Sequence, residues 1–446
     1  MATDTEGLNP NEMGPPVVLR STTGDNSANQ TAEIQCRQSM GIVPVKQVLY
    51  EALINDAERV LIDCTVQGAT SQLEVDGLWQ QLPMLDSQSA TMMVAVMKTL
   101  AHLNAQDRVS EQKGEFTANT GELGRRCHIT TVGTQTGERI ILKLQTKKPR
   151  FKAINELGIR DAILDEFKRL TGKYMEDQSQ QIHAGIFIVS APANGGGLST
   201  VWSHALSATD RFMRDFICLE PRGLKETEVE NIETMEVDLA AGETFPKKIA
   251  KARLKEPDVY VLPSIPDKDT LDTLCEEALN NNRMSIISVN ATDGVEAIHK
   301  IRSLGVAPDK FAKCLNGVLH MRMCRKLCDP CKQPFQPGPQ YIQQLGLPPS
   351  HVQVLYQHFQ PVPDEKGNLP EQCEACAGKG FSGRTGIFEL ITMDDQLRQA
   401  IATEPDLNII RRLALQLGNK STQQEGILHL AQGITSIQEL QRALSS

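Results

Sequence analysis

Two pairs of cysteines are the residues of this chain whose spacing most directly indicates a chemistry. "CDPC" at residues 328–331 and "CEAC" at residues 373–376 are C-x-x-C pairs, and 41 residues separate them. A C-x-x-C turn directs two thiolates at one tetrahedral ion, and a second pair completes its four ligands. The sequence therefore predicts a zinc site with the ligands Cys328, Cys331, Cys373 and Cys376.

The role of this site would be structural, because four protein ligands leave no open coordination position for a substrate. Two unrelated C-x-x-C turns, one of them redox-active, are the alternative interpretation. Cys324 lies close enough in the sequence to compete for one ligand position. The other cysteines stand singly in apolar or mixed contexts, which favours buried small hydrophobic residues: Cys36, Cys64, Cys127, Cys218, Cys275 and Cys314.

A glycine-rich stretch is the second candidate site. "SAPANGGGLSTVWSHAL" at residues 190–206 follows the apolar run "AGIFIV", which reads as a buried strand. A strand, a glycine-rich turn and a helix are the layout of a phosphate-binding loop, whose pattern is G-x-x-x-x-G-K-[ST]. Here Gly197 stands where that pattern has lysine, and Leu198 stands where it has the magnesium-binding Ser or Thr.

The candidate nucleotide-binding residues are those of this degenerate loop: Asn194, Gly195, Gly196, Gly197, Leu198, Ser199 and Thr200. Backbone N–H groups at a helix N-terminus could still bind an anion weakly. The simpler interpretation is a strand-to-helix turn, in which glycines allow positive φ at low steric cost. We prefer the turn, and we expect ATP and magnesium to bind weakly or not at all.

The composition is that of an ordinary globular protein, with 40% apolar and 23% charged residues among 446. A net charge of −9 argues against a nucleic-acid partner, since such proteins usually carry a basic face. No stretch approaches the roughly 20 apolar residues of a membrane span. The N-terminus lacks the basic and apolar regions of a signal peptide. These features predict a cytoplasmic protein whose cysteines are thiols or metal ligands.

The first half of the chain divides into three parts. Residues 1–40 are rich in Asn, Thr, Gly, Pro and Gln, and we predict a disordered tail there. Residues 41–147 contain helical and strand patterns, such as "IVPVKQVLYEALINDAE" and "RVLIDCTV", and predict an α+β domain. Residues 148–183 are charged and polar, and we expect a linker that contains a helix.

The second half begins with strands that alternate with helices over residues 184–322. "GIFIVSA", "DFICLE", "DVYVLPS" and "SIISVN" are the strand candidates. This alternation predicts an α/β domain with a parallel sheet that is covered on both faces. Residues 323–386 are rich in loops and hold the clustered cysteines, and residues 387–446 have a helical pattern.

The region of the cysteines also carries a family resemblance. "MRMCRKLCDPCKQPFQP" and "EQCEACAGKGFSGRTGIFELITMDDQLRQAI" closely resemble the tail of the type II secretion and type IV pilus assembly ATPases, the GspE/PulE/PilB family. "GNKSTQQEGILHLAQGITSIQELQRAL" matches the C-terminal helices of that family. "EVDGLW" and "GERIILKL" match the domain that precedes its RecA-like fold. The further N-terminal domain usual in the family is not recognisable.

The resemblance implies a small α+β domain, a linker, and a RecA-like P-loop-type domain with a zinc-knuckle insertion. It also implies a homo-oligomer in the form of a hexameric ring, at the inner-membrane face. ATP would bind between the two domains and drive their closure. The partner implied is the inner-membrane platform protein of a secretion system or pilus.

The positions at which this family carries its catalytic groups hold other residues here. "LEPRG" keeps Glu220 but lacks the following Asp, and Pro263-Ser264 stands in place of a catalytic Gly-Glu pair. The family histidine segment aligns with "IISVNATDG", which contains no histidine. Two arginine positions of the preceding domain align with Glu115 and His128. Ser264 cannot bind magnesium as a carboxylate would, and Glu115 would repel phosphate.

Losing single electrostatic groups from a phosphoryl-transfer site costs roughly 10²–10⁵ in rate. We therefore expect a catalytically degenerate relative of these ATPases, without a catalytic residue of its own. It would act as a scaffold or regulatory subunit, either in its own ring or in a mixed ring with an active paralogue. Two alternatives remain: a divergent ATPase that is still active, and a module that senses nucleotide without turnover.

Overall fold

The computed structural model describes residues 13–146, 151–172, 184–193, 196–224, 227–347, 352, 354–361, 363, 366 and 370–445. The chain divides into two compact units, Met1–Arg150 and Phe151–Ser446. Among the described residues, no helix has both the length and the apolar character needed to cross a membrane.

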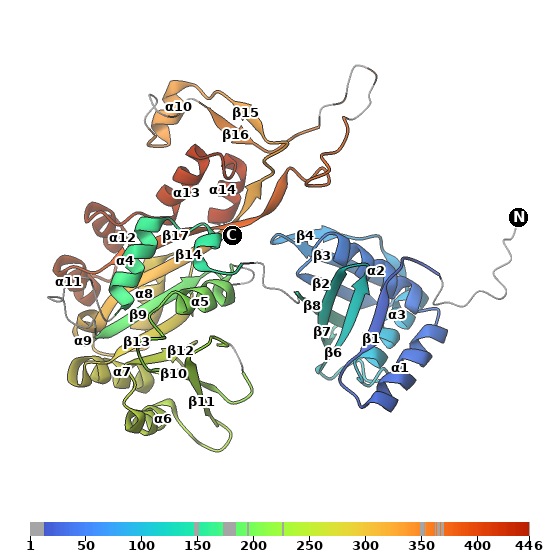
Figure 1. The fold of residues 1–446 in the computed structure, drawn as a ribbon, viewed down its shortest axis with the longest axis horizontal. Helices are drawn as coiled ribbons and strands as arrows, with labels where there is room; N and C mark the ends of the chain where they lie inside the picture. The colour runs from blue at the N-terminus through green and yellow to red at the C-terminus, as the bar shows by residue number, and fades with distance from the viewer. Residues whose placement is uncertain are drawn as a thin grey trace, which may run out of the picture. The chain divides into compact units, whose positions relative to one another are not determined.

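The first unit is an antiparallel sheet with three helices packed on one face (Figure 1). The sheet order is β1-β6-β7-β8-β2-β3-β4, and β5 pairs with β3. The strands are β1 (Val18–Ser21), β2 (Arg59–Thr65), β3 (Gly68–Val75), β4 (Leu78–Gln81), β5 (Leu85–Asp86), β6 (Gln112–Thr120), β7 (Leu123–Thr134) and β8 (Gly137–Thr146). The helices are α1 (Asn26–Gln38), α2 (Ile42–Ile54) and α3 (Ser87–Leu100).

The structure corrects the expectation of a disordered tail for residues 18–38, whereas residues 1–12 of that tail lie outside the described residues. β1 pairs with β6, and α1 begins at Asn26, where the Asp25 carboxylate accepts a hydrogen bond from the Ala28 N–H. Leu19 and Cys36 are buried in the core of the unit. The physical reason is that a few apolar residues with strand and helix spacing are enough to fix a segment against an existing sheet, even where most of its residues are polar.

The second unit is built on a seven-stranded sheet with the order β11-β10-β12-β13-β9-β14-β17 (Figure 1). Neighbouring strands are parallel except for β17, which runs antiparallel to β14. The strands are β9 (Gly185–Ala191), β10 (Phe216–Pro221), β11 (Ile232–Val237), β12 (Val259–Leu262), β13 (Met284–Asn290), β14 (Leu315–Leu327) and β17 (Phe381–Thr392). The expected α/β fold with a parallel sheet is confirmed.

Helices cover both faces of this sheet, so every residue of its interior strand β9 is buried. Ile186 and Ile188 point into a core shared with one set of helices: α6 (Phe245–Ala252), α7 (Lys268–Asn281), α8 (Gly294–Arg302), α9 (Pro308–Cys314), α11 (Asp395–Thr403) and α12 (Leu407–Gln416). Phe187 and Val189 point to the opposite face, which carries η2 (Ile154–Leu157), α4 (Asp161–Thr171) and α5 (Leu198–Ser207).

The cysteine-containing segment leaves the sheet at the end of β14 and returns to it in β17. It carries the two-stranded sheet of β15 (Gln333–Phe335) and β16 (Leu355–Gln357), with α10 (Pro339–Gln344). Its small core joins Ile342 and Leu355 to the C-terminal helices α13 (Thr422–Ala431) and α14 (Ile437–Ser445). The main sheet therefore extends into both ends of residues 323–386, and residues 387–446 begin inside β17 before becoming helical.

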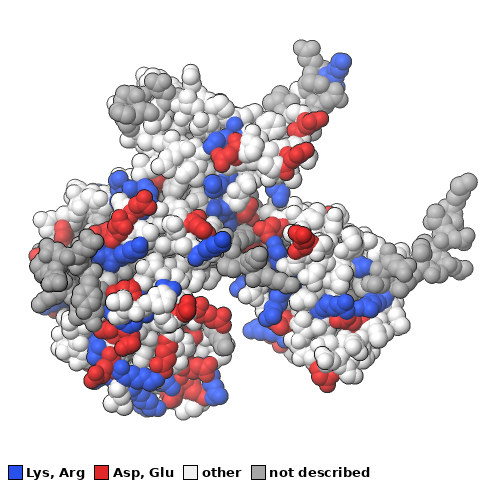
Figure 2. All heavy atoms as spheres, viewed as in Figure 1, with Lys and Arg blue, Asp and Glu red and all other residues white. Residues whose placement is uncertain are grey.

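Charged side chains of the second unit are interspersed rather than gathered by sign over α6 and β11 (Figure 2). Many of them pair locally. Glu243 accepts hydrogen bonds from Lys248 at 3.1 Å and from Lys251 at 3.2 Å. Partly exposed pairs such as these add little stability, and they mainly keep the surface polar.

Candidate functional site

The four predicted zinc ligands lie together. The sulfur atoms of Cys328, Cys331, Cys373 and Cys376 are all within 4.8 Å of one another. Cys328 Sγ lies 3.8 Å from Cys373 Sγ, and Cys331 Sγ lies 3.7 Å from Cys376 Sγ. Four sulfurs at about 2.3 Å from a zinc ion form a tetrahedron with edges of about 3.8 Å. The cluster therefore has the dimensions of a zinc site, which fits the expected cofactor.

Tight turns place these sulfurs. The N–H of Cys331 donates to the carbonyl oxygen of Cys328, and the N–H of Cys376 donates to that of Cys373. Gly380 has a φ of 73°, and its N–H donates to Cys376 Sγ at 3.2 Å. A hydrogen bond of this kind orients a thiolate and stabilises its charge.

Cys324 does not join the cluster. It is fully buried in β14, and burial, followed by the nearby charge of Glu439, raises the pKa of its thiol to about 12. The sequence left Cys324 open as a competing ligand. In the structure, the two C-x-x-C pairs supply all four sulfurs of the cluster.

The glycine-rich loop follows β9 as the sequence predicts. Asn194 and Gly195 lie outside the described residues. Leu198, Ser199 and Thr200 form the first turn of α5. A Cβ atom at Gly196 would lie 2.2 Å from the carbonyl oxygen of Pro192, so only glycine fits there.

The conformation and the surroundings of Gly197 both disfavour a side chain at this position. Its φ is 88°, in the left-handed region that favours glycine. A Cβ atom at this position would lie 2.8 Å from Met321 Cε and 2.9 Å from Met323 Cγ. Both methionines come from β14. A side chain at this position would therefore require Met321 and Met323 to move.

The strand ends beside the loop carry only part of the expected acidic groups. Glu220 is buried, 2% exposed, near the end of β10. Ser264 follows the end of β12 and is exposed. The carbonyl oxygen of the preceding Pro263 accepts a hydrogen bond from Ser288 Oγ at 2.5 Å. Asn290 ends β13, and its amide cannot titrate as a histidine would.

The two arginine positions of the preceding domain hold side chains that pair with each other. Glu115 on β6 faces His128 on β7 in the strand register. Their atoms Oε2 and Nδ1 are 3.4 Å apart, and Arg126 lies 4.0 Å from the same carboxylate. Of the remaining arginines in this domain, Arg139 binds Asp63 at 2.6 Å. Glu115 and Arg139 therefore each have a partner within their own sheet.

Sequence reasoning did not find a polar row that crosses three strands. Ser190 on β9, His320 on β14 and Glu389 on β17 are in register with one another. Ser190 Oγ and His320 Nδ1 are 2.8 Å apart. The other ring nitrogen of His320, Nε2, has no hydrogen-bond partner among the described residues. Burial, followed by the charge of Arg322, lowers the pKa of His320 to about 3. Only the strand register brings these residues together.

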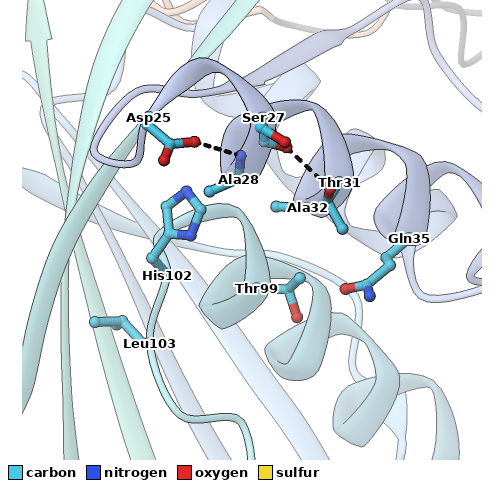
Figure 3. Close-up of a pocket in the computed structure, with 9 residues that line it drawn as sticks. All are labelled: Asp25, Ser27, Ala28, Thr31, Ala32, Gln35, Thr99, His102 and Leu103. Carbon is cyan, nitrogen blue, oxygen red and sulfur yellow. Dashed lines mark hydrogen bonds between the residues drawn. The ribbon is translucent and has the colours of Figure 1, made fainter.

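A shallow hollow of about 640 Å³ in the first unit lies between α1 and the end of α3 (Figure 3). Asp25 caps α1 by accepting from the Ala28 N–H at 2.8 Å. His102 Nε2 lies 2.8 Å from Ser21 Oγ and 2.7 Å from Asn29 Oδ1. Since its polar groups already hold each other and it has no Lys or Arg among its lining residues, it does not suit a phosphate.

Comparisons with known proteins agree with the fold and with the resemblance. The family model described as Type II/IV secretion system protein matches residues 37–442. The chain is 26% identical over 398 residues to the Type IV pilus assembly ATPase PilB of Thermus thermophilus, covering 89% of this chain and 42% of that protein. It is 23% identical over 398 residues to the Type II secretion system protein E of Pseudomonas aeruginosa, covering 89% and 74%.

Among solved structures, the ATPase DotB of Legionella pneumophila superposes with a TM-score of 0.54 at 12% identity, over 90% of this chain and 95% of that one. DotB of Yersinia pseudotuberculosis gives 0.53 at 14% identity, over 90% and 92%. These likenesses support the fold. Because the family model matches most of its residues, this chain belongs to the type II/IV secretion system protein family.

Proposed function

We propose that this protein is a non-hydrolysing member of its family that acts as a scaffold or regulatory subunit in secretion or pilus assembly. The similarity to the PilB protein and to the type II secretion system protein E supports the system in which it works. The absence of a lysine at Gly197, of a hydroxyl at Leu198 and of a carboxylate at Ser264 supports the lack of hydrolysis.

One observation carries this proposal. At Gly197 the backbone is left-handed and methionine side chains fill the space beside it. A lysine lost by simple substitution would leave a loop that still has room for it. Here the loop and β14 have packed together without it, as is expected of a turn that serves the fold.

For assembly we propose a ring, formed either by copies of this chain or together with an active paralogue. The partner would be the inner-membrane platform of the system, and the protein would work at that membrane face. In a mixed ring, this chain would hold its place without hydrolysing ATP. The zinc ion would fix the segment of β15, β16 and α10 on the second unit.

A binding measurement tests the proposal. Calorimetry and thermal unfolding of the purified full chain with ATP and magnesium should show no binding. A ligand at 100 times its dissociation constant adds about 2.7 kcal/mol to stability, so real binding would raise the melting temperature visibly. Such a rise would support the alternative of a nucleotide sensor and count against the turn interpretation.

Light scattering of the chain, alone and with a paralogue that carries the full phosphate-binding motif, tests assembly. The scaffold proposal predicts self-association or a mixed assembly. A strict monomer that also fails to join the paralogue would contradict it.

A further inference from the structure

The turn between the last two helices lies against the cysteine segment. α13 ends at Ala431 and α14 begins at Ile437, and we call residues 432–436 between them the C-terminal turn. Thr435 and Ser436 of this turn are completely buried although they are polar. Since buried backbone groups need hydrogen-bond partners, the partners of this turn show what holds it in place.

Residues on both sides of the first cysteine pair supply two of these partners. Leu327, which directly precedes the pair, donates its N–H to the carbonyl oxygen of Ile434 at 2.8 Å. Lys332, which directly follows the pair, donates from Nζ to the carbonyl oxygen of Gly433 at 3.1 Å. The turn that carries the first pair is therefore hydrogen-bonded at both of its ends to the C-terminal turn.

Lys332 is held in this position by further contacts. Its Nζ donates to Asp329 Oδ1 at 2.7 Å and lies 4.8 Å from the centre of the Tyr356 ring. Tyr356 belongs to β16, and a Cβ atom at Gly433 would lie 2.6 Å from its Cδ2 atom. Lys332 therefore joins three segments: the turn of the first cysteine pair, β16 and the C-terminal turn.

A second set of contacts holds the C-terminal turn on the main sheet. Thr435 Oγ1 donates to the carbonyl oxygen of Arg325 at 2.9 Å. Arg325 also donates from Nε and Nη2 to the Glu439 carboxylate at 2.9 and 2.7 Å. Because Arg325 lies in β14, these contacts need no metal. Losing the contacts at the cysteine pair would thus loosen the C-terminal turn without detaching the helices.

The cysteine segment has a small core of its own. The Cys328 N–H donates to the carbonyl oxygen of Gly380 at 3.0 Å, and the side chains of Ile342, Leu347 and Leu355 pack with the C-terminal helices. Segments with so little apolar burial generally need a metal or a disulfide to remain folded. A zinc ion on the four cysteines would supply this stability, because binding of a structural metal is coupled to folding.

We propose that the turn of the first cysteine pair and Lys332 form a zinc-dependent anchor for the C-terminal turn, so that loss of the metal loosens residues 432–436 and α14. The proposal rests on the zinc site included in the proposed function, and it is independent of whether the chain hydrolyses ATP. Linkage makes the effect reciprocal: the factor by which zinc stabilises the anchored turn is the factor by which the anchor raises the affinity for zinc.

Hydrogen exchange of the full chain, measured by mass spectrometry, tests the anchor. Zinc-loaded protein is compared with protein from which a chelator has removed the metal, as verified by metal analysis. Exchange in the C-terminal turn and in α14 should become about tenfold faster without zinc, because local opening becomes easier. α11 is the internal reference and should not change, since its Leu397 and Ile401 belong to the core of the main sheet. Equal exchange of the C-terminal turn in both forms would overturn the proposal.

A substitution that leaves all four cysteines in place tests the role of Lys332. Lys332→Met should keep its zinc, but exchange in the C-terminal turn should be about fivefold faster and zinc affinity about fivefold lower, because one hydrogen bond is lost. Competition with a chromogenic chelator measures the affinity. Lys332→Arg, which can still donate, should retain most of both properties. Lys379→Met is the matched control, since Lys379 is an exposed lysine of the same segment, and it should change neither. Unchanged values in Lys332→Met would contradict the role of Lys332.

The outcomes distinguish this proposal from the proposed function. A purified chain that binds no zinc would overturn both the zinc site and the anchor, and would leave the lack of ATP hydrolysis to its own test. A chain that binds zinc without an effect on the C-terminal turn would overturn the anchor alone. ATP hydrolysis by a chain whose C-terminal turn does depend on zinc would overturn the lack of hydrolysis and support the anchor.

Discussion

The cysteine cluster and the glycine-rich loop lie in the same unit, but they differ in how completely the residues of their motifs are present. In the cluster, four side chains occupy the corners of a tetrahedron whose edges suit zinc. In the loop, a helix still follows the strand, while Gly197 and Leu198 stand where the motif has its lysine and its Ser or Thr. If the proposed function is right, a site whose ligands also hold the fold has stayed with the fold, whereas a site that serves only catalysis has been lost from it.

The same contrast appears in the packing around each site. The cysteine turns are fixed by hydrogen bonds to the sulfurs and carbonyls, such as that from Gly380 to Cys376 Sγ. Beside the loop, Met321 and Met323 lie within 3 Å of where a Cβ atom at Gly197 would stand, so they would have to move to admit a side chain. Polar groups thus determine the geometry of the cysteine turns, whereas apolar neighbours surround the loop at Gly197.

The largest effect is expected at the cysteines. Cys373→Ser should lower bound zinc from near one per chain to below about 0.1, because losing a ligand removes binding energy that is coupled to folding. Metal analysis and proteolysis of the segment that carries β15 and β16 measure the change. Cys324→Ala is the control and should keep its zinc. A metal-free preparation that is as stable as the native protein would contradict the assignment of a structural zinc site.

The next effect concerns the loop. Gly197→Lys should destabilise the protein by about 2–4 kcal/mol, from the left-handed backbone and from overlap with the methionines. Denaturant unfolding measures it. Gly223→Lys is the control for backbone conformation alone, because Gly223 has a φ of 82° and nothing within 4 Å of its Cβ position.

Adding Met323→Ala to Gly197→Lys sharpens this test. The double variant should be more stable than the sum of the single changes predicts, by at least about 1 kcal/mol, because the two residues would compete for one space. Additive effects would show that the methionine does not fill the position of the lysine. A stable Gly197→Lys variant that binds ATP would show that the loop is still a nucleotide site.

A third prediction concerns pH and the polar row behind the loop. The pKa of Glu389 is raised from 4.5 to about 7, so the folded state holds this proton more tightly than the unfolded state. The resulting stability is present below pH 4.5 and is lost as the pH rises through 7. The stability of Glu389→Gln relative to the native protein should therefore increase by about 3 kcal/mol between pH 4.5 and 8. A constant difference would contradict the raised pKa.

The smallest effect is expected in the first unit. Glu115→Ala removes a partly exposed partner of His128 and should change stability by at most about 1 kcal/mol. It should also leave the response to ATP unchanged, since the native protein is expected to show none. An appearance of ATP binding in this variant would mean that Glu115 alone repels the nucleotide, and that the loop has kept its affinity.

The sequence predicts best where spacing alone determines geometry. Two C-x-x-C pairs must each turn tightly, so the cysteine cluster follows from their positions. The parallel sheet follows from apolar runs such as β9, which alternate with helices. The structured segment around Leu19 and Cys36 was predicted as a tail, because its few apolar residues stand among many polar ones.

Other features depend on residues far apart in the chain. Met321 lies beside Gly197 only because β14 pairs with β9. Ser190, His320 and Glu389 form a row only in the register of three strands. Neither a pattern nor a motif in one segment could have shown that a side chain at Gly197 would meet methionines, since those side chains come from another strand.

Hydrolysis of ATP by the unmodified protein is the most direct test of the central claim. The full chain, purified with its zinc, should release phosphate from ATP and magnesium no faster than a Gly196→Trp variant. That variant cannot form the loop, because even a Cβ atom at Gly196 would lie 2.2 Å from the Pro192 carbonyl oxygen. We predict equal background rates for the two proteins. Magnesium-dependent release by the native chain that the substitution abolishes would contradict the account and show that this protein is an active ATPase.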